Sequence, residues 1–424
     1  MKIGLYLQNK ELSQQQYEND MLAVKNADID LLVFPENCIT GFSEQVNERD
    51  ICDVNDCNWF IDTCTDFASS LGKAIVFSGI EKYGAIFSLF VNPFAGDQET
   101  FWKFYVKHTA TELSAFDFDN YSDEWIKDQF DPIVMCGHKI GLTICYDCNH
   151  AAFSRMWAKN GIDILINSTG GNVDYYKWYR YNKVRAMENN CINLCTMGYE
   201  SGQKNSSYTF GFSPSGYPIK YETISKPSAE TPCGIFVYDT DNISNNGICD
   251  IRFDQSPKEN KYTHCSINPN NLPYILSKSK MIENDLYISE TIDRTLVYIV
   301  INDEEIEKPE KLLKKMYSPE LARYKNKRYI VLNIWENFDR KHFENVISDT
   351  LRVRSMENYC AVIFSAPNVK KCYQTTQNKG SQIIPLTSDG YFALDIDRCK
   401  GPEVVWHKKP QTWRAGYEKL ISKL

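Results

Sequence analysis

The sequence predicts an α/β fold, and three patterns support that prediction. Short apolar runs alternate with amphipathic stretches over residues 1–245, which is typical of strands and helices stacked in layers. The apolar runs 85–91 and 100–106 are separated by Asn-Pro and Gly-Asp pairs, which indicate a hairpin and therefore a mixed sheet. Part of the pattern recurs after residue 286. We therefore expect a layered α/β domain followed by a smaller α/β half-copy of the same fold.

The first domain is expected to open with a strand at 3–7 and then a helix. Ser13 can cap that helix, and Tyr17, Met21 and Val24 recur at helical spacing on one face. Further strands are predicted at 30–34, 74–80, 85–91, 100–106, 139–144, 162–166, 191–197, 208–212 and 235–238, and helices at 58–71, 153–159 and 178–190. Turn-rich sequences such as ISNNG and NPNNLP follow. We therefore divide the chain into a domain at 1–245, an irregular linker at 246–285 and a second domain at 286–424.

Composition narrows the function classes. Lys+Arg 47 against Asp+Glu 55 gives 47 − 55 = −8, and no block of like charge suggests a nucleic-acid partner. No apolar run is long enough to span a membrane. Because the amino-terminal sequence does not resemble a signal peptide, the 15 cysteines are expected to be reduced thiols in a cytoplasmic protein. Cys145 and Cys148 form a single CxxC without a second ligand pair, so we expect no metal.

Three predicted strands end on residues that carry chemistry. Cys145 follows the apolar run 140–144, and a helix amino terminus after it would favour the thiolate. Glu36 and Lys107 follow the strands 30–34 and 100–106. Taken singly, the cysteine could be a small core residue and the two charges could be surface groups. Together they supply a nucleophile, a general base and a cation for an oxyanion.

These three residues lie in motifs that resemble a known family. VFPENCITGF, FYVKHTATE and GLTICYD carry Glu36, Lys107 and Cys145 in that order, and they are similar to the three motifs of the nitrilase (carbon–nitrogen hydrolase) superfamily. KNGIDILINSTGGN, VRAMENN and SSYTFGFSPSGYPI resemble the segments that follow. The resemblance covers residues 1–245. It implies a four-layer αββα sandwich and a cofactor-free hydrolase that forms a thioester on Cys145 with a small amide.

The resemblance also implies further site residues. The backbone N–H of Tyr146 would join Lys107 in the oxyanion hole. Many members use a second glutamate after the lysine, for which Glu112 is the nearest candidate and Glu124 lies in range.

The chain departs from the family just after the nucleophile. Many members have an arginine, a proline and a glutamate there, whereas this chain has Asn149 and His150, which we expect near the substrate. The ordinary alternative for His150 is a surface loop. Arg185 and Glu188 of VRAMENN are expected to form a buried structural ion pair rather than to take part in chemistry.

The second domain repeats part of the first. VRSMENYC at 353–360 is identical to VRAMENNC at 184–191 in six of eight positions. YIVLN at 329–333 and SQIIPLTSDGYFALD at 381–395 echo ILIN and SSYTFGFSPSGYPIK, and SPELAR at 318–323 resembles the post-nucleophile run of the family. These matches predict a truncated copy of the first domain.

The repeat lacks a nucleophile. Placing TLVYIVIND over KIGLTICYD puts Ile301 at the position of Cys145 and Asp303 over Asp147. The repeat also has no evident equivalents of the Glu36 and Lys107 strands. We therefore expect 286–424 to be catalytically inactive.

The resemblance implies how the copies pair. Members of the family commonly dimerise through the helices beside the nucleophile, so we expect the second copy to dock on the first as an intramolecular pseudo-dimer, with a homo-oligomer also possible. A duplication without functional contact is the alternative.

The predicted activity is hydrolysis of a small linear amide. Nitrile or N-carbamoyl hydrolysis by the same site remains open, because pocket residues outside the motifs decide the substrate. The alternative of another class is a non-catalytic ligand-binding pseudo-enzyme, which the intact Glu36, Lys107 and Cys145 disfavour. An acyl transferase and a glutamine-dependent ammonia supplier share the fold, but the latter normally needs a fused synthetase domain, which nothing in 246–424 resembles.

Overall fold

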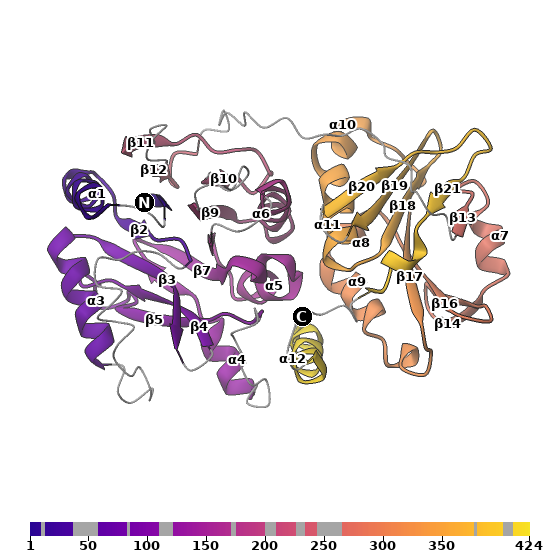
Figure 1. The fold of residues 1–424 in the computed structure, drawn as a ribbon, viewed down its shortest axis with the longest axis horizontal. Helices are drawn as coiled ribbons and strands as arrows, with labels where there is room; N and C mark the ends of the chain where they lie inside the picture. Colours follow the sequence, from indigo (N-terminus) through magenta and orange to yellow (C-terminus); the bar gives the residue numbers. More distant parts are fainter. Residues whose placement is uncertain are drawn as a thin grey trace. The chain divides into compact units, whose positions relative to one another are not determined.

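The computed structural model describes residues 1–9, 13–36, 58–82, 85–109, 122–170, 175–199, 209–225, 234–243, 265–376, 380–401 and 410–424. The chain forms two compact units (Figure 1). The first comprises Met1–Asp250 and Trp406–Gly416, and the second comprises Ile251–Val405 and Tyr417–Leu424. The last helix, α12 (Pro410–Lys423), is shared between the two.

The first unit is built on two half-sheets that meet along β1 and β9. One contains β1 (Lys2–Asn9), β2 (Leu31–Val33), β3 (Ala74–Lys82), β4 (Ala85–Val91), β5 (Trp102–Val106), β11 (Glu222–Ser225) and β12 (Gly234–Asp239). The other contains β6 (Ile133–Met135), β7 (His138–Ile144), β8 (Ile164–Thr169), β9 (Ile192–Tyr199) and β10 (Phe210–Phe212). Gln8 and Asn9 of β1 join them by pairing in parallel with Gly198 and Tyr199. The fold is therefore a mixed α/β structure.

Helices cover each half-sheet (Figure 1). α1 (Gln14–Asn26) and α3 (Asn58–Leu71) pack on the first half-sheet, and α5 (Ala151–Lys159) and α6 (Tyr175–Asn189) lie beside the second. Ser13 caps α1 as predicted, and its hydroxyl accepts the Gln16 N–H at 3.2 Å. The sequence did not predict α4 (Asp123–Gln129), β6 or β11, because each is too short for a clear period.

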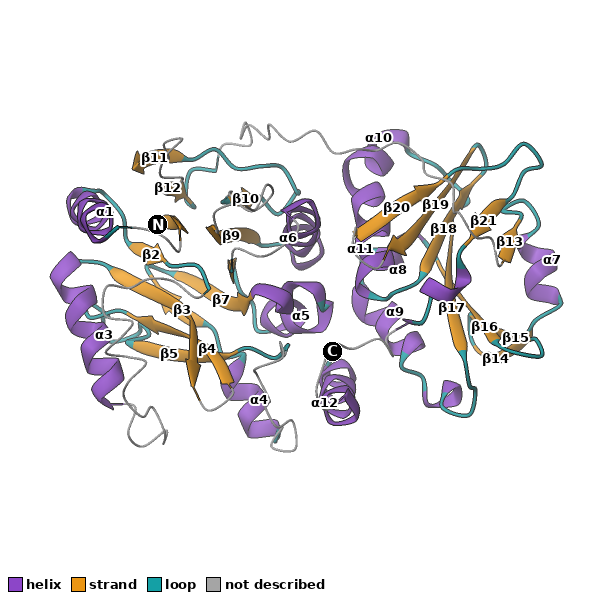
Figure 2. Ribbon diagram, in the orientation of Figure 1, coloured by secondary structure: helices purple, strands orange, loops and turns teal. Residues whose placement is uncertain are grey.

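The described part of the second unit contains a seven-stranded sheet. Its strands run in the order β14 (Lys280–Glu283), β15 (Leu286–Glu290), β16 (Thr295–Ile301), β17 (Lys327–Ile334), β18 (Ala361–Ala366), β19 (Val369–Thr376), β20 (Gly380–Ile384). On one face lie α8 (Asp303–Ile306), α9 (Pro309–Met316), α10 (Arg340–His342) and α11 (Ser348–Glu357), and on the other lie α7 (Leu272–Ser277) and the pair β13 (Cys265–Ile267) and β21 (Phe392–Leu394) (Figure 2). Apolar residues fill both faces.

Two expectations about the second unit need correction. The segment 246–285 was expected to be an irregular linker, but its described part, 265–285, holds β13, α7 and β14. Its turn-rich sequence connects short elements, and Ile267 and Leu272 are buried in the core of the second unit. SPELAR lies after α9, in the 3₁₀ turn Pro319–Leu321. It is therefore too far from β16 to follow a nucleophile position.

One half-sheet of the first unit and the second sheet share an order of strands. β6, β7, β8 and β9 pair antiparallel, parallel and parallel in turn, and so do β15, β16, β17 and β18. An antiparallel strand follows in each case, β10 or β19. The helices α5 and α6 follow β7 and β8, as α9 and α11 follow β16 and β17.

The register of the strands suggests a different alignment for Ile301. Asn167 of β8 lies opposite Thr143, and Asn333 of β17 lies opposite Ile301. If the two asparagines correspond, Ile301 matches Thr143 rather than Cys145.

Two hydrogen bonds support the same register. The Asp147 carboxylate accepts the N–H of Ile144 at 3.2 Å, and the Glu305 carboxylate accepts the N–H of Asn302 at 3.2 Å. In this register Asp303 would match Cys145, and Glu305 would match Asp147. This register differs from the predicted alignment by two residues, a slip that leaves every strand residue on its original face.

Candidate active site

The ends of three strands bring Glu36, Lys107 and Cys145 together. The Lys107 ammonium donates to Glu36 Oε1 at 2.7 Å, and the two side chains are 1% and 5% exposed. The other oxygen, Oε2, accepts the N–H of Gly170 at 3.0 Å just beyond β8. The Glu36 carboxylate also lies near enough to the Cys145 thiol to act on its ionisation. Glu36 and Lys107 come from one half-sheet and Cys145 from the other, so the site depends on how the two half-sheets meet.

The charges around Cys145 favour a thiol at rest. Burial and the neighbouring Glu36 carboxylate raise the pKa of the Cys145 thiol well above its usual value, while Lys107 opposes that rise. Burial works against the Lys107 charge, but Glu36 and Cys145 raise the pKa of its ammonium above the usual value. Lys107 is therefore charged, and a base is needed to ionise the sulfur.

This arrangement differs from the helix-stabilised thiolate that the sequence suggested. A 3₁₀ turn at Cys145–Asn149, here called the nucleophile turn, separates the cysteine from α5, which begins at Ala151. The helix α5 therefore does not begin at the cysteine. The influence of a helix dipole falls off within about one turn.

Backbone strain marks the nucleophile position. Cys145 has a φ of +46°, in the left-handed region that costs a non-glycine residue about 1–3 kcal/mol. Strained strand-to-helix turns present catalytic serines in the α/β-hydrolases. In the second unit, Asn302 is extended and Asp303 begins α8 directly.

Residues 6–210 match the carbon–nitrogen hydrolase family. No curated protein matches the chain.

Several solved structures of the amidase from Nesterenkonia sp. AN1 are similar to part of the chain. One shows Michael addition of acrylamide at the active-site cysteine; it is 18% identical, with a TM-score of 0.40, over 56% of this chain and 92% of that one. A second carries the acetamide moiety of fluoroacetamide, with 19% identity, a TM-score of 0.40 and coverage of 56% and 89%. A third is a complex with butyramide, with 17% identity, a TM-score of 0.40 and coverage of 56% and 90%.

Asp147 of the carbon–nitrogen hydrolase region is a site residue that the sequence reasoning missed. Its side chain is fully buried and accepts hydrogen bonds from the segment 105–109 and from Ile144. Burial raises the pKa of Asp147 to about 6, although Lys107 and the hydrogen bonds from Thr109 oppose that rise. The residue stands in the motif GLTICYD, but the sequence does not show which groups its carboxylate contacts.

The residues expected near the substrate have different surroundings. Tyr146 is half-buried between the rings of His150 and Trp178, at centroid distances of 5.7 and 6.1 Å. Asn149 is 2% exposed, and its Nδ2 is among the buried side-chain atoms of the described residues that lack a hydrogen-bond partner. Burial lowers the pKa of His150 to about 3, so this histidine is neutral.

The structure does not decide between the two candidates for a second catalytic glutamate. Glu112 lies outside the described residues. Glu124 lies exposed in the first turn of α4. The identity of a fourth catalytic group stays a prediction.

The predicted structural ion pair is confirmed. Arg185 and Glu188 lie within 2.5 Å, with side chains 0% and 2% exposed, and Arg185 Nε donates to the carbonyl of Cys148 at 2.9 Å. In the second unit, Arg354 pairs with Glu357 at 2.7 Å, and its Nε donates to the carbonyl of Ile306 at 3.0 Å. Because a turn without a cysteine has the same support, we assign the arginine to the fold.

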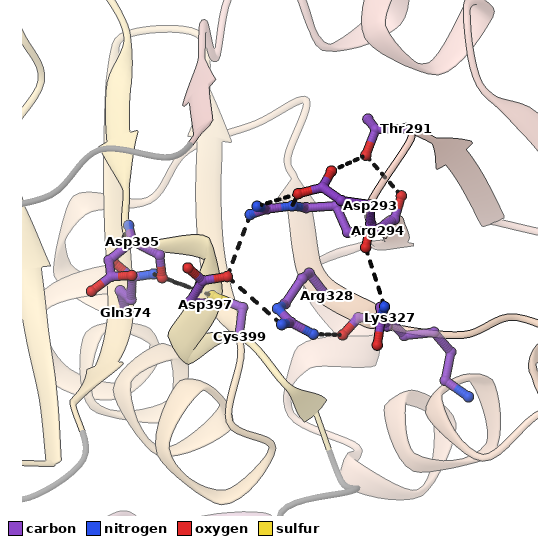
Figure 3. Close-up of polar contacts among 10 residues, drawn as sticks. Thr291, Asp293, Arg294, Lys327, Arg328, Gln374, Asp395, Asp397 and Cys399 are labelled. Carbon is purple, nitrogen blue, oxygen red and sulfur yellow. Dashed lines mark hydrogen bonds and ion pairs between the residues drawn. The ribbon is translucent and has the colours of Figure 1, made fainter.

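Figure 3 shows a second polar cluster, in the second unit. Arg294 and Arg328 approach Asp397 at 3.4 and 3.7 Å, and Arg294 also pairs with Asp293 at 2.7 Å. The aspartate side chains are about half exposed or more. Such solvent-facing pairs contribute little free energy, and the opposite charges compensate one another. We assign this cluster to the surface of the fold.

Across the described ranges, no helix is long and apolar enough to cross a membrane.

Proposed function

We propose that the first unit hydrolyses the carbon–nitrogen bond of a small linear amide through a thioester on Cys145. The observation that carries this proposal is the buried ion pair of Glu36 with Lys107, whose charges both act on the buried Cys145 thiol. A base, a cation and a nucleophile that share one dry site are what acyl transfer from an amide requires. We also infer that this unit has the four-layer αββα arrangement of the family.

Acylation begins with a proton transfer. Glu36 takes the thiol proton of Cys145 as the sulfur attacks the amide carbon, and the carbonyl π electrons move onto oxygen. The Lys107 ammonium and the N–H of Tyr146 stabilise that oxyanion. The carbonyl then re-forms, the C–N bond breaks, and Glu36 gives its proton to the departing amine.

Deacylation repeats the sequence with water. Glu36 takes a proton from a water molecule as the water oxygen attacks the thioester carbon. The C–S bond then breaks, the proton returns to the sulfur of Cys145, and the carboxylic acid leaves. A free thiol is needed in every cycle, so we infer a reducing compartment such as the cytoplasm.

We also propose that the second unit is an inactive half-copy of the first. The shared strand order and the matching arginine pairs support this proposal. Within its described residues, the sheet has counterparts of β6–β10 but none of the strands that carry Glu36 and Lys107. A nucleophile alone would therefore not restore catalysis there.

The pairing of the two copies as an intramolecular pseudo-dimer stays a proposal from the sequence. If the second copy takes the place of a partner chain, the protein is a monomer of 49.0 kDa in solution. Sedimentation equilibrium checks this mass. A stable dimer would contradict the proposed pairing.

A screen of small amides, ureas and nitriles for ammonia release tests the function. We expect turnover of at least one linear amide and its loss, by at least about 10⁴-fold, in Cys145→Ala. Preference for a nitrile or a urea would redirect the substrate class. Equal activity in Cys145→Ala would contradict the proposal.

A further inference from the structure

We propose that Asp147 is a positioning residue that fixes the nucleophile turn against the strand end carrying Lys107. Asp147 Oδ1 accepts the N–H of His108 at 3.1 Å and the N–H and hydroxyl of Thr109 at 2.9 and 2.8 Å. Oδ2 accepts the hydroxyl of Tyr105 at 3.0 Å. The donors therefore lie on both sides of Lys107 in the chain.

Asp147 also contacts the residue that directly precedes its own turn. Oδ2 also accepts the N–H of Ile144, the residue before the nucleophile, at 3.2 Å. One fully buried carboxylate thus joins the residue that precedes Cys145 to the residues that flank Lys107. Since these come from different half-sheets, the carboxylate sets the position of the cation relative to the sulfur.

The second unit separates this role from that of folding the turn. Glu305, the counterpart of Asp147, keeps the bond to the N–H at the start of its turn. Its other contacts are with Lys311 and Lys315 of the following helix, at 3.7 and 3.5 Å. A turn of this kind therefore folds without a link to another half-sheet. The link is present where Lys107 is present.

Replacing the carboxylate by an amide, in Asp147→Asn, should break the link. The amide side chain would offer one acceptor oxygen and an NH₂ group, which would face donors that the carboxylate now satisfies. Thr109→Val and Tyr105→Phe each remove one bond and leave the carboxylate. They are milder variants with which to grade the effect.

The effect of Asp147 on turnover rests on the proposed function, but its effect on the Cys145 thiol does not. The test therefore measures the reactivity of that thiol. The probe is iodoacetamide, and the readout is the rate of alkylation of the Cys145 peptide against pH. Glu36, Lys107 and Cys148 are titratable groups that act on this thiol. If Asp147 holds Lys107 in place, Asp147→Asn should slow alkylation at least tenfold at neutral pH and move the profile to higher pH.

The direction of the shift distinguishes positioning from charge alone. Removal of a nearby negative charge by itself would ease ionisation of the thiol and move the profile to lower pH. Thr109→Val and Tyr105→Phe should give intermediate slowing. In a Lys107→Gln background, Asp147→Asn should change the rate by less than twofold, because the residue acts through the lysine.

The control separates local effects from lower stability. Val24→Ala in α1 removes buried methyl groups far along the chain from the site and should leave the alkylation profile unchanged below its melting temperature. An unchanged profile in Asp147→Asn, or a shift to lower pH, would overturn the positioning role. Wild-type protein that hydrolyses no amide but shows the predicted profiles would instead overturn the proposed function alone.

Discussion

Two turns, one in each unit, show what catalysis adds to a shared framework. Both follow a parallel strand, both are closed by a carboxylate on the first N–H, and both rest on a buried arginine. The turn in the first unit adds a strained cysteine at φ +46° and a carboxylate bonded to a second half-sheet. A turn of this kind therefore folds without a strained residue and without a hydrogen bond to another half-sheet. We infer that these two features of the first unit serve its site.

The largest expected difference between the units is in the stability lost when one lysine of each is replaced. Lys107→Met leaves the Glu36 charge buried and unpaired, so we expect a loss of about 3–5 kcal/mol in the free energy of unfolding. Turnover should fall with it. Lys315→Met in the second unit removes an ion pair to Glu305 in which both side chains are about 15% exposed, so its cost should be smaller, about 1 kcal/mol. Denaturant unfolding measures both, and equal costs would break the comparison.

Acid should destabilise the first unit through His108. Burial lowers the pKa of His108 to about 3, so the unfolded state binds its proton more readily. The contribution of the neutral His108 ring to the free energy of unfolding is fully present above about pH 6.5 and is lost as the pH falls toward 3. We expect a loss of about 2 kcal/mol between pH 7 and pH 5 from this group.

His108→Phe isolates that contribution. The ring lies stacked on Phe130 and Phe153, at centroid distances of 5.2 and 4.8 Å, so phenylalanine fits the surroundings. Calorimetry at pH 7 and pH 5 should show a smaller shift of the first-unit transition in the variant. An identical shift in both proteins would exclude His108 as the source.

A buried amide side chain also distinguishes the two sheets. Asn193 of β9 is 0% exposed, and both its polar atoms lack a hydrogen-bond partner within the described structure. The strand register matches it to Val362, which lies in the apolar core. Asn193→Val should stabilise the protein by about 1–2 kcal/mol and Val362→Asn should destabilise it by about 3 kcal/mol. Thermal melts that show a loss in both variants would refute this account.

The smallest effect concerns the strain at Cys145. Glycine accepts a positive φ, so Cys145→Gly should be about 1 kcal/mol more stable than Cys145→Ala. In the regular helix α5, Ala158→Gly should instead lose about 1 kcal/mol. Chemical denaturation of the four proteins decides, and a less stable Cys145→Gly would indicate that the turn is relaxed.

The sequence was sufficient for the three strand ends and insufficient for what lies between them. Motif order placed Glu36, Lys107 and Cys145, because each follows a strong apolar run. The link from Asp147 to the segment 105–109 could not be predicted, since it depends on how two half-sheets meet. The alignment of Ile301 with Cys145 is uncertain by sequence alone for a different reason. Side chains in a strand alternate with a period of two, so a two-residue slip satisfies the same hydrophobic pattern.

Trapping the acyl group on the enzyme tests the central claim most directly. The wild-type chain is quenched during turnover of a slow small amide, and its intact mass and cysteine peptides are measured. We predict one adduct of the acyl mass, on the peptide that contains Cys145, and its absence in Cys145→Ala. An adduct on a cysteine of the second unit, or turnover that persists in Cys145→Ala, would contradict the account.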